Sequence, residues 1–85
     1  MKRITDRNLE AVVARINRMT GSPIKPYVEG QPQANCYLLD YAYGRVALHR
    51  MMPTGTGQRE IISRGTKREL YDQLFAFIAG LEART

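Results

Sequence analysis

Apolar residues recur every three or four positions in two segments, one near each end of the chain. This spacing is typical of amphipathic helices that bury one face. In the first segment, Thr5 is a suitable N-cap and Gly21 a suitable left-handed residue after the last turn, so a helix is predicted over about residues 5–20. The positions expected to be buried are Leu9, Val12, Val13, Ile16 and Met19. The opposite side carries an arginine stripe that comprises Arg7, Arg15 and Arg18.

The second helical segment follows the stretch SRGTKRE. Thr66 and Glu69 have the spacing of a capping box, in which each side chain bonds the backbone N–H of the other residue. A helix is therefore predicted over about residues 66–82. The residues expected on its buried side are Leu70, Leu74, Phe77, Ile78 and Leu81, with Tyr71 and Phe75 beside them.

Between these segments the pattern changes from helical spacing to alternation. In NCYLLDYAYGRVALHRMM the tyrosines stand at alternate positions, and Gly44 separates this run from the next. Period two predicts strands, and a glycine between two such runs is typical of a hairpin turn. Strands are predicted over about residues 35–43 and 46–52, and a third over about 58–63, after the turn PTGTG. The preceding segment, over residues 21–34, is rich in proline and is predicted to be a loop.

The predicted order is helix, three strands, helix. Strands joined by short turns form an antiparallel sheet, and two amphipathic helices can cover only one of its faces. The sequence therefore predicts an α+β two-layer sandwich, in which one domain spans residues 1–85 and one sheet face stays uncovered. Part of the following set is expected on the uncovered face: Tyr37, Tyr41, Tyr43, His49, Arg50 and Arg59. Because Leu39 shares the face of the tyrosines, the alternative that they pack under the helices stays open.

Composition limits the class of protein. The chain has 85 residues, of which 44% are hydrophobic and 25% charged, as expected for one small globular domain. A single cysteine, Cys36, and the lack of a CxxC pair argue against a disulfide scaffold or a zinc ribbon and favour a reducing cytoplasm. The N-terminus is polar where a signal peptide is apolar, and no apolar run is long enough to span a membrane. We expect a cytoplasmic protein with no cofactor, no metal and no membrane contact.

The charge balance points to an anionic partner. Thirteen Lys and Arg against eight Asp and Glu give a net charge of +5, which favours partners such as nucleic acid. The start of the second helix is basic, and backbone N–H groups at a helix N-terminus attract anions. The alternative is that Glu69 and Asp72 neutralise these cations. The predicted nucleic-acid-binding residues are Arg64, Lys67 and Arg68, with Arg15 and Arg18 of the first helix.

The tyrosines offer a second kind of binding surface. Aromatic side chains beside arginines are typical of protein interaction sites. If the tyrosine face is the uncovered one, it would bind a partner protein, and an exposed sheet edge would allow two copies to pair. The predicted protein-interaction residues are Tyr37, Tyr41, Tyr43 and Arg50.

No pattern in the chain indicates catalysis. His49 is the only histidine and has no second residue at metal-ligand or acid-base spacing. Cys36 is expected to be a buried apolar residue rather than a nucleophile. The stretch PTGTGQRE has glycines but lacks the ending of a phosphate-binding loop, and a strand follows it. We therefore expect the protein not to be an enzyme.

Two resemblances support this picture. The stretch GTKRE and the order helix, three strands, helix resemble double-stranded RNA-binding domains, with Lys67 and Arg68 in the place of their paired lysines. The stretches RITDRNLEAVVARINRMTGSP, LDYAYGRVALHR and SRGTKRELYDQLFAFIAGLE resemble small hypothetical proteins of tailed bacteriophages and prophages. The second resemblance implies a viral protein of the bacterial cytoplasm and brings no assigned activity. The expectation is a non-enzymatic binding module for nucleic acid or, alternatively, for a host or phage protein.

Overall fold

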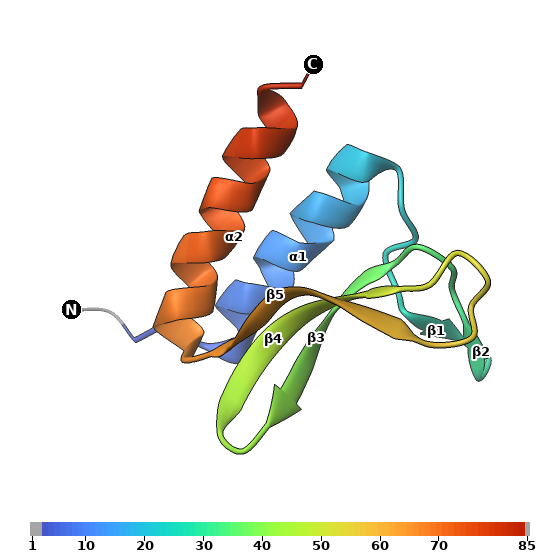
Figure 1. Cartoon of the computed structure of the whole chain (residues 1–85), viewed down its shortest axis with the longest axis horizontal. Coiled ribbons are helices and arrows are strands. Elements are labelled where there is room, and N and C mark those ends of the chain that lie inside the picture. Colours follow the sequence, from blue (N-terminus) through green and yellow to red (C-terminus); the bar gives the residue numbers. More distant parts are fainter. Residues whose placement is uncertain (1–2, 85) are drawn as a thin grey trace.

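The fold was analysed in a computed structural model that describes residues 3–84. Two helices, a three-stranded sheet and a small hairpin make up the structure (Figure 1). In chain order the elements are α1 (Asp6–Thr20), β1 (Tyr27–Val28), β2 (Gln31–Pro32), β3 (Tyr37–Ala42), β4 (Arg45–Met51), β5 (Gln58–Gly65) and α2 (Lys67–Glu82). The predicted α+β fold, with an antiparallel three-stranded sheet between two helices in the chain, is confirmed.

Both helices begin at the predicted caps. The Oγ1 atom of Thr5 accepts a hydrogen bond from the Asn8 backbone N–H, and the Asn8 side chain accepts one from the Thr5 N–H. The predicted capping box of α2 is present, because Thr66 and Glu69 exchange the same two bonds. The bond from the Thr66 backbone lowers the pKa of the Glu69 carboxyl below its ordinary value. Gly21 ends α1 with a φ of 70°, as predicted.

The sheet has the strand order β3-β4-β5, and all neighbours are antiparallel. Strands β3 and β4 are joined by Tyr43 and Gly44, whose φ values of 54° and 70° are those of a two-residue type I′ hairpin turn. The pairing of β4 with β5 shifts register where Leu48 faces Ile62 and His49 faces Glu60. Ile61 is therefore a bulge residue, and Ile61 and Ile62 both pack against the core.

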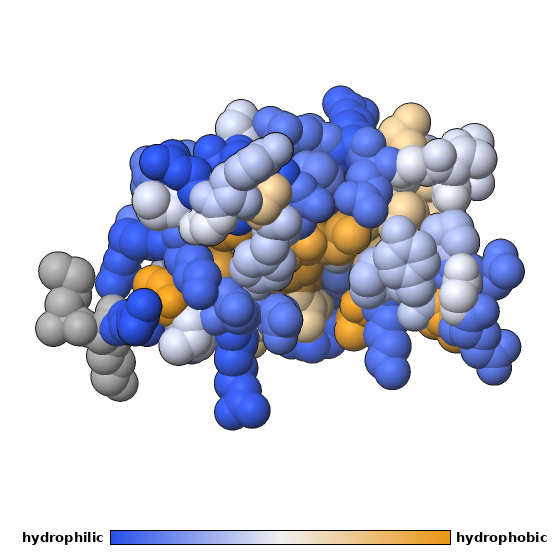
Figure 2. All heavy atoms as spheres, turned by 90° about the horizontal axis from the view of Figure 1, so that it is seen from below, coloured by the Kyte–Doolittle hydropathy of each residue, from blue (hydrophilic) through white to orange (hydrophobic). Residues whose placement is uncertain are grey.

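The core lies between one sheet face and both helices. α1 packs against β3, and α2 packs against β4 and β5, so the helices lie side by side on the same layer (Figure 1). Hydrophilic side chains dominate the surface seen from below, and apolar atoms show between them (Figure 2). The buried cluster consists of Leu9, Val12, Val13, Ile16, Tyr37, Val46, Leu48, Leu70, Leu74 and Ile78.

The predictions for the first loop and for the buried side of α1 are partly wrong. The segment over residues 21–34 is not all loop, because β1 and β2 pair in a hairpin whose turn residues Glu29 and Gly30 have positive φ. Met19, predicted to be buried, is 39% exposed, whereas Asn17 is 1% exposed. The polar Asn17 takes the inward position because it bonds the sheet backbone, which a hydrophobic pattern does not reveal.

Candidate binding site

The tyrosine side of β3 faces the helices. Tyr37 is 6% exposed, and its ring meets that of Phe77 edge to face at 5.7 Å between centroids. Tyr37 therefore does not belong to the part of the expected set that lies on the uncovered face, because the strand register directs Tyr37 and Leu39 into the core. The alternative, that these residues pack under the helices, describes the structure.

The other two candidate tyrosines lie apart from Tyr37. Tyr41 is 46% exposed at the side of α1, where partial burial, the charges of Asp6 and Glu10 and a hydrogen bond with Asp6 raise its pKa to about 12. Tyr43 is 97% exposed in the hairpin turn. The candidate tyrosines thus do not form one continuous aromatic surface with Arg50.

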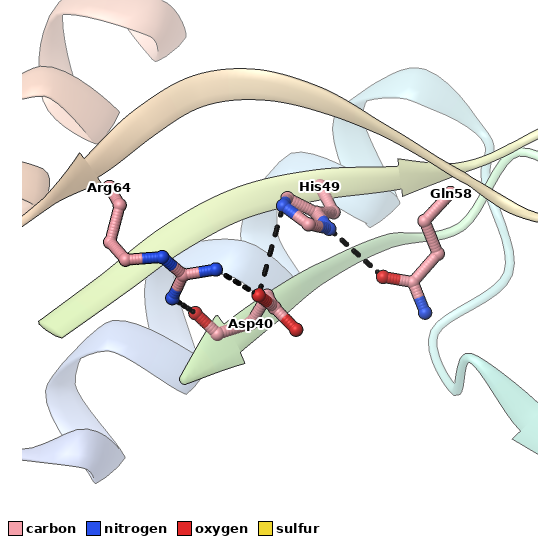
Figure 3. A network of polar contacts seen from close by, with 4 residues as sticks. All are labelled: Asp40, His49, Gln58 and Arg64. Carbon is pink, nitrogen blue, oxygen red and sulfur yellow. Dashed lines mark hydrogen bonds and ion pairs between the residues drawn. The ribbon is translucent and has the colours of Figure 1, made fainter. Parts of the chain in front are cut away.

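The uncovered sheet face carries a polar network instead (Figure 3). The Arg64 guanidinium donates to the backbone carbonyl of Asp40 at 2.8 Å and also to its carboxylate. His49 Nδ1 lies 2.9 Å from Gln58 Oε1, and His49 Nε2 lies 3.9 Å from Asp40 Oδ2. The bond from Arg64 holds the pKa of the Asp40 carboxyl below its ordinary value, despite partial desolvation. Because Asp40 is the register partner of Ala47, this network also explains why Ala47 is fully buried on a face without a helix.

The residues predicted to bind nucleic acid are divided among separate contacts. Arg64 lies on the uncovered face with Asp40, whereas Lys67 Nζ pairs with Asp6 Oδ1 at 2.9 Å. Arg15 and Glu82 form an exposed pair at 3.8 Å between the two helices. Arg18 is exposed in the last turn of α1, and Arg68 is exposed in the first turn of α2. Lys67 and Arg68 thus lie in the first turn of α2, whereas Arg64 belongs to β5 and Arg15 and Arg18 belong to α1, so the five predicted residues are spread over three elements.

A different group of arginines surrounds a pocket of about 650 Å³ between α2 and the strands β4 and β5. Arg50 and Arg59 come from the two strands, and Arg84 follows the end of α2. We call this feature the arginine pocket. Among the described residues that line it, none is acidic. The apolar part of its lining consists of Tyr37, Met51, Met52, Pro53, Ile61, Phe77 and Leu81.

Neighbouring groups hold Arg50 in a defined position. Its Nε donates to the Asn35 carbonyl at 2.9 Å, and its Nη2 lies 3.5 Å from Ser22 Oγ. The guanidinium carbon lies 4.5 Å from the centroid of the Tyr37 ring, within cation-π range. All of these partners are neutral, so the positive charge of Arg50 has no direct counter-charge among them.

Arg59 lies directly opposite Arg50 in the pairing of β4 with β5. Like charges at directly opposite positions of a sheet destabilise the pairing. Among residues 3–84, no ion pair involves Arg50, Arg59 or Arg84. The pocket thus concentrates positive charge next to an apolar surface without internal compensation.

Cys36 and the acidic and histidine side chains offer little basis for catalysis or metal binding. Burial raises the pKa of the Cys36 thiol, which is fully buried and donates to the Tyr37 carbonyl, so it is poorly suited to act as a nucleophile. Within the described part of the chain, no three His, Cys, Asp or Glu side chains are grouped so as to hold a metal ion. No described helix has both the length and the apolar character needed to cross a membrane.

Sequence reasoning named Arg50 and Arg59 but did not bring them together. Arg50 and Arg59 are paired by the register of β4 and β5, and this register contains a bulge. The alternation of apolar and polar residues alone does not define such a register. Arg84 was missed because its approach to the strands depends on how α2 packs.

Comparisons of the chain with models of protein families, with curated proteins and with solved structures found no match.

Proposed function

We propose that the protein is a non-enzymatic binding module that captures an acidic segment of a partner protein in the arginine pocket. The observation that carries the proposal is the direct opposition of Arg50 and Arg59 in a pocket whose described lining residues include no acidic one. Such an arrangement weakens the free protein and is relieved when a ligand brings negative charge. In the bacterial cytoplasm implied by the phage resemblance, the partner is a host or phage protein.

The lining of the pocket specifies the ligand further. Its volume of about 650 Å³ lies in the range of ordinary ligand sites, and an apolar floor with a few charged groups is their usual composition. Guanidinium groups bind carboxylates through paired hydrogen bonds. A partner segment that places glutamate or aspartate beside an apolar side chain therefore fits both parts of the pocket.

Nucleic acid fits the same pocket less well. Binding of single-stranded bases relies on stacking against aromatic faces. Here Arg50 covers a face of the Tyr37 ring, and Phe77 already contacts that ring edge to face. An electrostatic attraction to phosphate remains, as expected from a net charge of +5. The two ligand classes therefore need a direct comparison.

The test compares two labelled probes by fluorescence anisotropy. One is a peptide with a phenylalanine between two pairs of glutamates, and the other is a single-stranded DNA of equal net charge. We expect Arg59→Gln to weaken peptide binding by about tenfold or more, since a hydrogen bond to a charged group contributes roughly 1.5–3 kcal/mol. Arg7→Gln removes the same charge from the exposed side of α1 and should change the affinity little.

Three results would reject the proposal. The first is equal loss in Arg59→Gln and Arg7→Gln, which would indicate nonspecific attraction. The second is tighter binding of the DNA with a steep dependence on salt, which would favour the nucleic-acid hypothesis. In that case Lys67→Gln and Arg68→Gln should weaken DNA binding, as first expected. The third is no binding of either probe.

A further inference from the structure

The outer edge of β3 leaves part of its backbone without a partner strand. β3 is the first strand in the order β3-β4-β5 and pairs only with β4. Hydrogen-bonded positions alternate along an antiparallel pair. Met51 N–H donates to the Cys36 carbonyl, so the even-numbered residues of β3 bond β4. The N–H and C=O groups of Tyr37, Leu39 and Tyr41 therefore point away from β4, toward the open edge of the sheet.

Asn17 occupies the first of these three positions. Its Oδ1 accepts from the Tyr37 N–H at 2.8 Å, and its Nδ2 donates to the Tyr37 carbonyl at 3.0 Å. This is the exchange of bonds that a residue of a neighbouring strand would make. Within residues 3–84, no corresponding partner contacts the outward backbone groups of Leu39 and Tyr41. The edge thus offers two N–H and two C=O groups in a known register.

A groove of about 290 Å³ runs along this edge, between α1 and β3. Its walls are largely apolar, and Glu10 is the charged residue among the described residues that line it. The groove lies on the helix side of the sheet, whereas Asp40 projects on the other side. An added strand would therefore meet an apolar surface on one face and a carboxylate on the other. The groove is lined by Glu10, Val13, Ala14, Asn17, Ile24, Pro26, Tyr37, Leu38, Leu39 and Tyr41.

The register argues against a second copy of the chain as the occupant. A two-fold pairing that uses both open positions places Leu39 opposite Tyr41 of the other copy, and Asp40 opposite Asp40. Like charges directly opposite each other are unfavourable, and this pair would lie at a position where side chains approach closely. The other two-fold registers need Tyr37, which Asn17 already bonds, or Tyr43, which belongs to the turn.

We propose that the β3 edge and this groove bind an extended segment of another protein with the pattern apolar, basic, apolar. The two apolar residues pair with Leu39 and Tyr41 and direct their side chains into the groove. The basic residue between them lies opposite Asp40 on the uncovered face, where it meets the carboxylate. This site is separate from the arginine pocket and selects the opposite charge. Addition of a strand to an exposed edge supplies affinity through the backbone and selectivity through alternate side chains.

The test uses two blocked peptides, Ser-Ile-Lys-Ile-Ser and Ser-Ile-Glu-Ile-Ser, titrated into the labelled protein and followed by NMR. We expect the lysine peptide to shift the amide signals of β3 and to bind roughly fivefold more tightly than the glutamate peptide. In the free protein the amides of Leu39 and Tyr41 should exchange rapidly with solvent, and the lysine peptide should slow this exchange.

Two protein variants locate the site. Ala14→Arg fills the groove and should abolish binding, whereas Ala11→Arg places the same side chain on the exposed side of α1 and should not. Asp40→Asn should remove the preference for the lysine peptide. Thermal unfolding of each variant checks that the fold is retained.

The following results would overturn the inference. Peptides with N-methylated isoleucines that bind equally well would show that the backbone edge is not used. Slow exchange of the Leu39 and Tyr41 amides that grows with protein concentration, without peptide, would identify a second copy as the occupant. An absence of shifts at β3 with millimolar peptide would also reject the site.

Discussion

Asn17 connects the first helix to the sheet through a single side chain. It is 1% exposed, and its amide bonds both backbone groups of Tyr37. A buried backbone group without a partner costs about 1–3 kcal/mol. Asn17 therefore stabilises the position of α1 against β3, and it also closes one end of the open strand edge.

Replacement of Asn17 by leucine should destabilise the protein by about 2–4 kcal/mol, because both groups of Tyr37 lose their partner. The loss should appear as a lower midpoint in urea unfolding with a similar slope. Arg18→Leu is the control, since Arg18 is exposed in the same turn and should change stability by less than about 0.5 kcal/mol. Equal effects of the two substitutions would contradict this role of Asn17.

The bond between Arg64 and Asp40 should make stability depend on pH in the acidic range. The pKa of Asp40 is lower in the folded protein than its ordinary value of 3.8. Its contribution is therefore fully present above the ordinary pKa and is lost as the pH falls through the lowered one. Asp40→Asn should flatten the decline of unfolding free energy below about pH 4, measured by denaturant titration across pH. Glu29→Gln removes a carboxylate from the β1–β2 turn and serves as the matched control for the loss of one negative charge.

At the scale of elements, Tyr43 is an unfavourable residue for the backbone conformation of the turn between β3 and β4. Tyr43 has a φ of 54° and is 97% exposed, so it has backbone strain and almost no packing. Asparagine and glycine accept this conformation far more readily, and Asn-Gly is the preferred pair for type I′ turns.

Tyr43→Asn should therefore stabilise the protein by about 0.5–1 kcal/mol, measured as a higher midpoint of thermal unfolding. Gly44→Ala should have the opposite effect, because Gly44 has a φ of 70°. A stability loss in Tyr43→Asn would show that the exposed ring makes a contact that offsets its strain. If Tyr43 instead binds a partner, as the sequence suggested, the same variant should capture that partner less well.

At the scale of the whole molecule, local signals predicted most of the fold. Caps at Thr5 and Thr66, helical spacing and the glycine at position 44 act over a few residues, and each was interpreted correctly from the chain. The face of each strand and the partner of each arginine depend on register, which distant parts of the chain determine together. For this reason the sequence left the burial of Tyr37 as one of two alternatives and gave no indication that Arg50 and Arg59 stand opposite each other, and the structure decides both points.

The arginine pocket links the stability of the molecule to its proposed role. If Arg50 and Arg59 repel each other in the free protein, Arg59→Gln should raise the unfolding free energy by about 0.2–1 kcal/mol while it weakens binding of the acidic peptide. Repulsion between partly exposed charges is screened by salt, so the gain should shrink between low and high ionic strength. Arg7→Gln, measured by the same urea titrations, separates this local effect from the general decrease in net charge.

A gain in stability together with a loss of binding would show that the repulsion between Arg50 and Arg59 destabilises the free protein and that the same two charges are needed to bind the ligand. A loss of both would mean that Arg59 is a structural residue, and the arginine pocket would then lose its main support as a binding site.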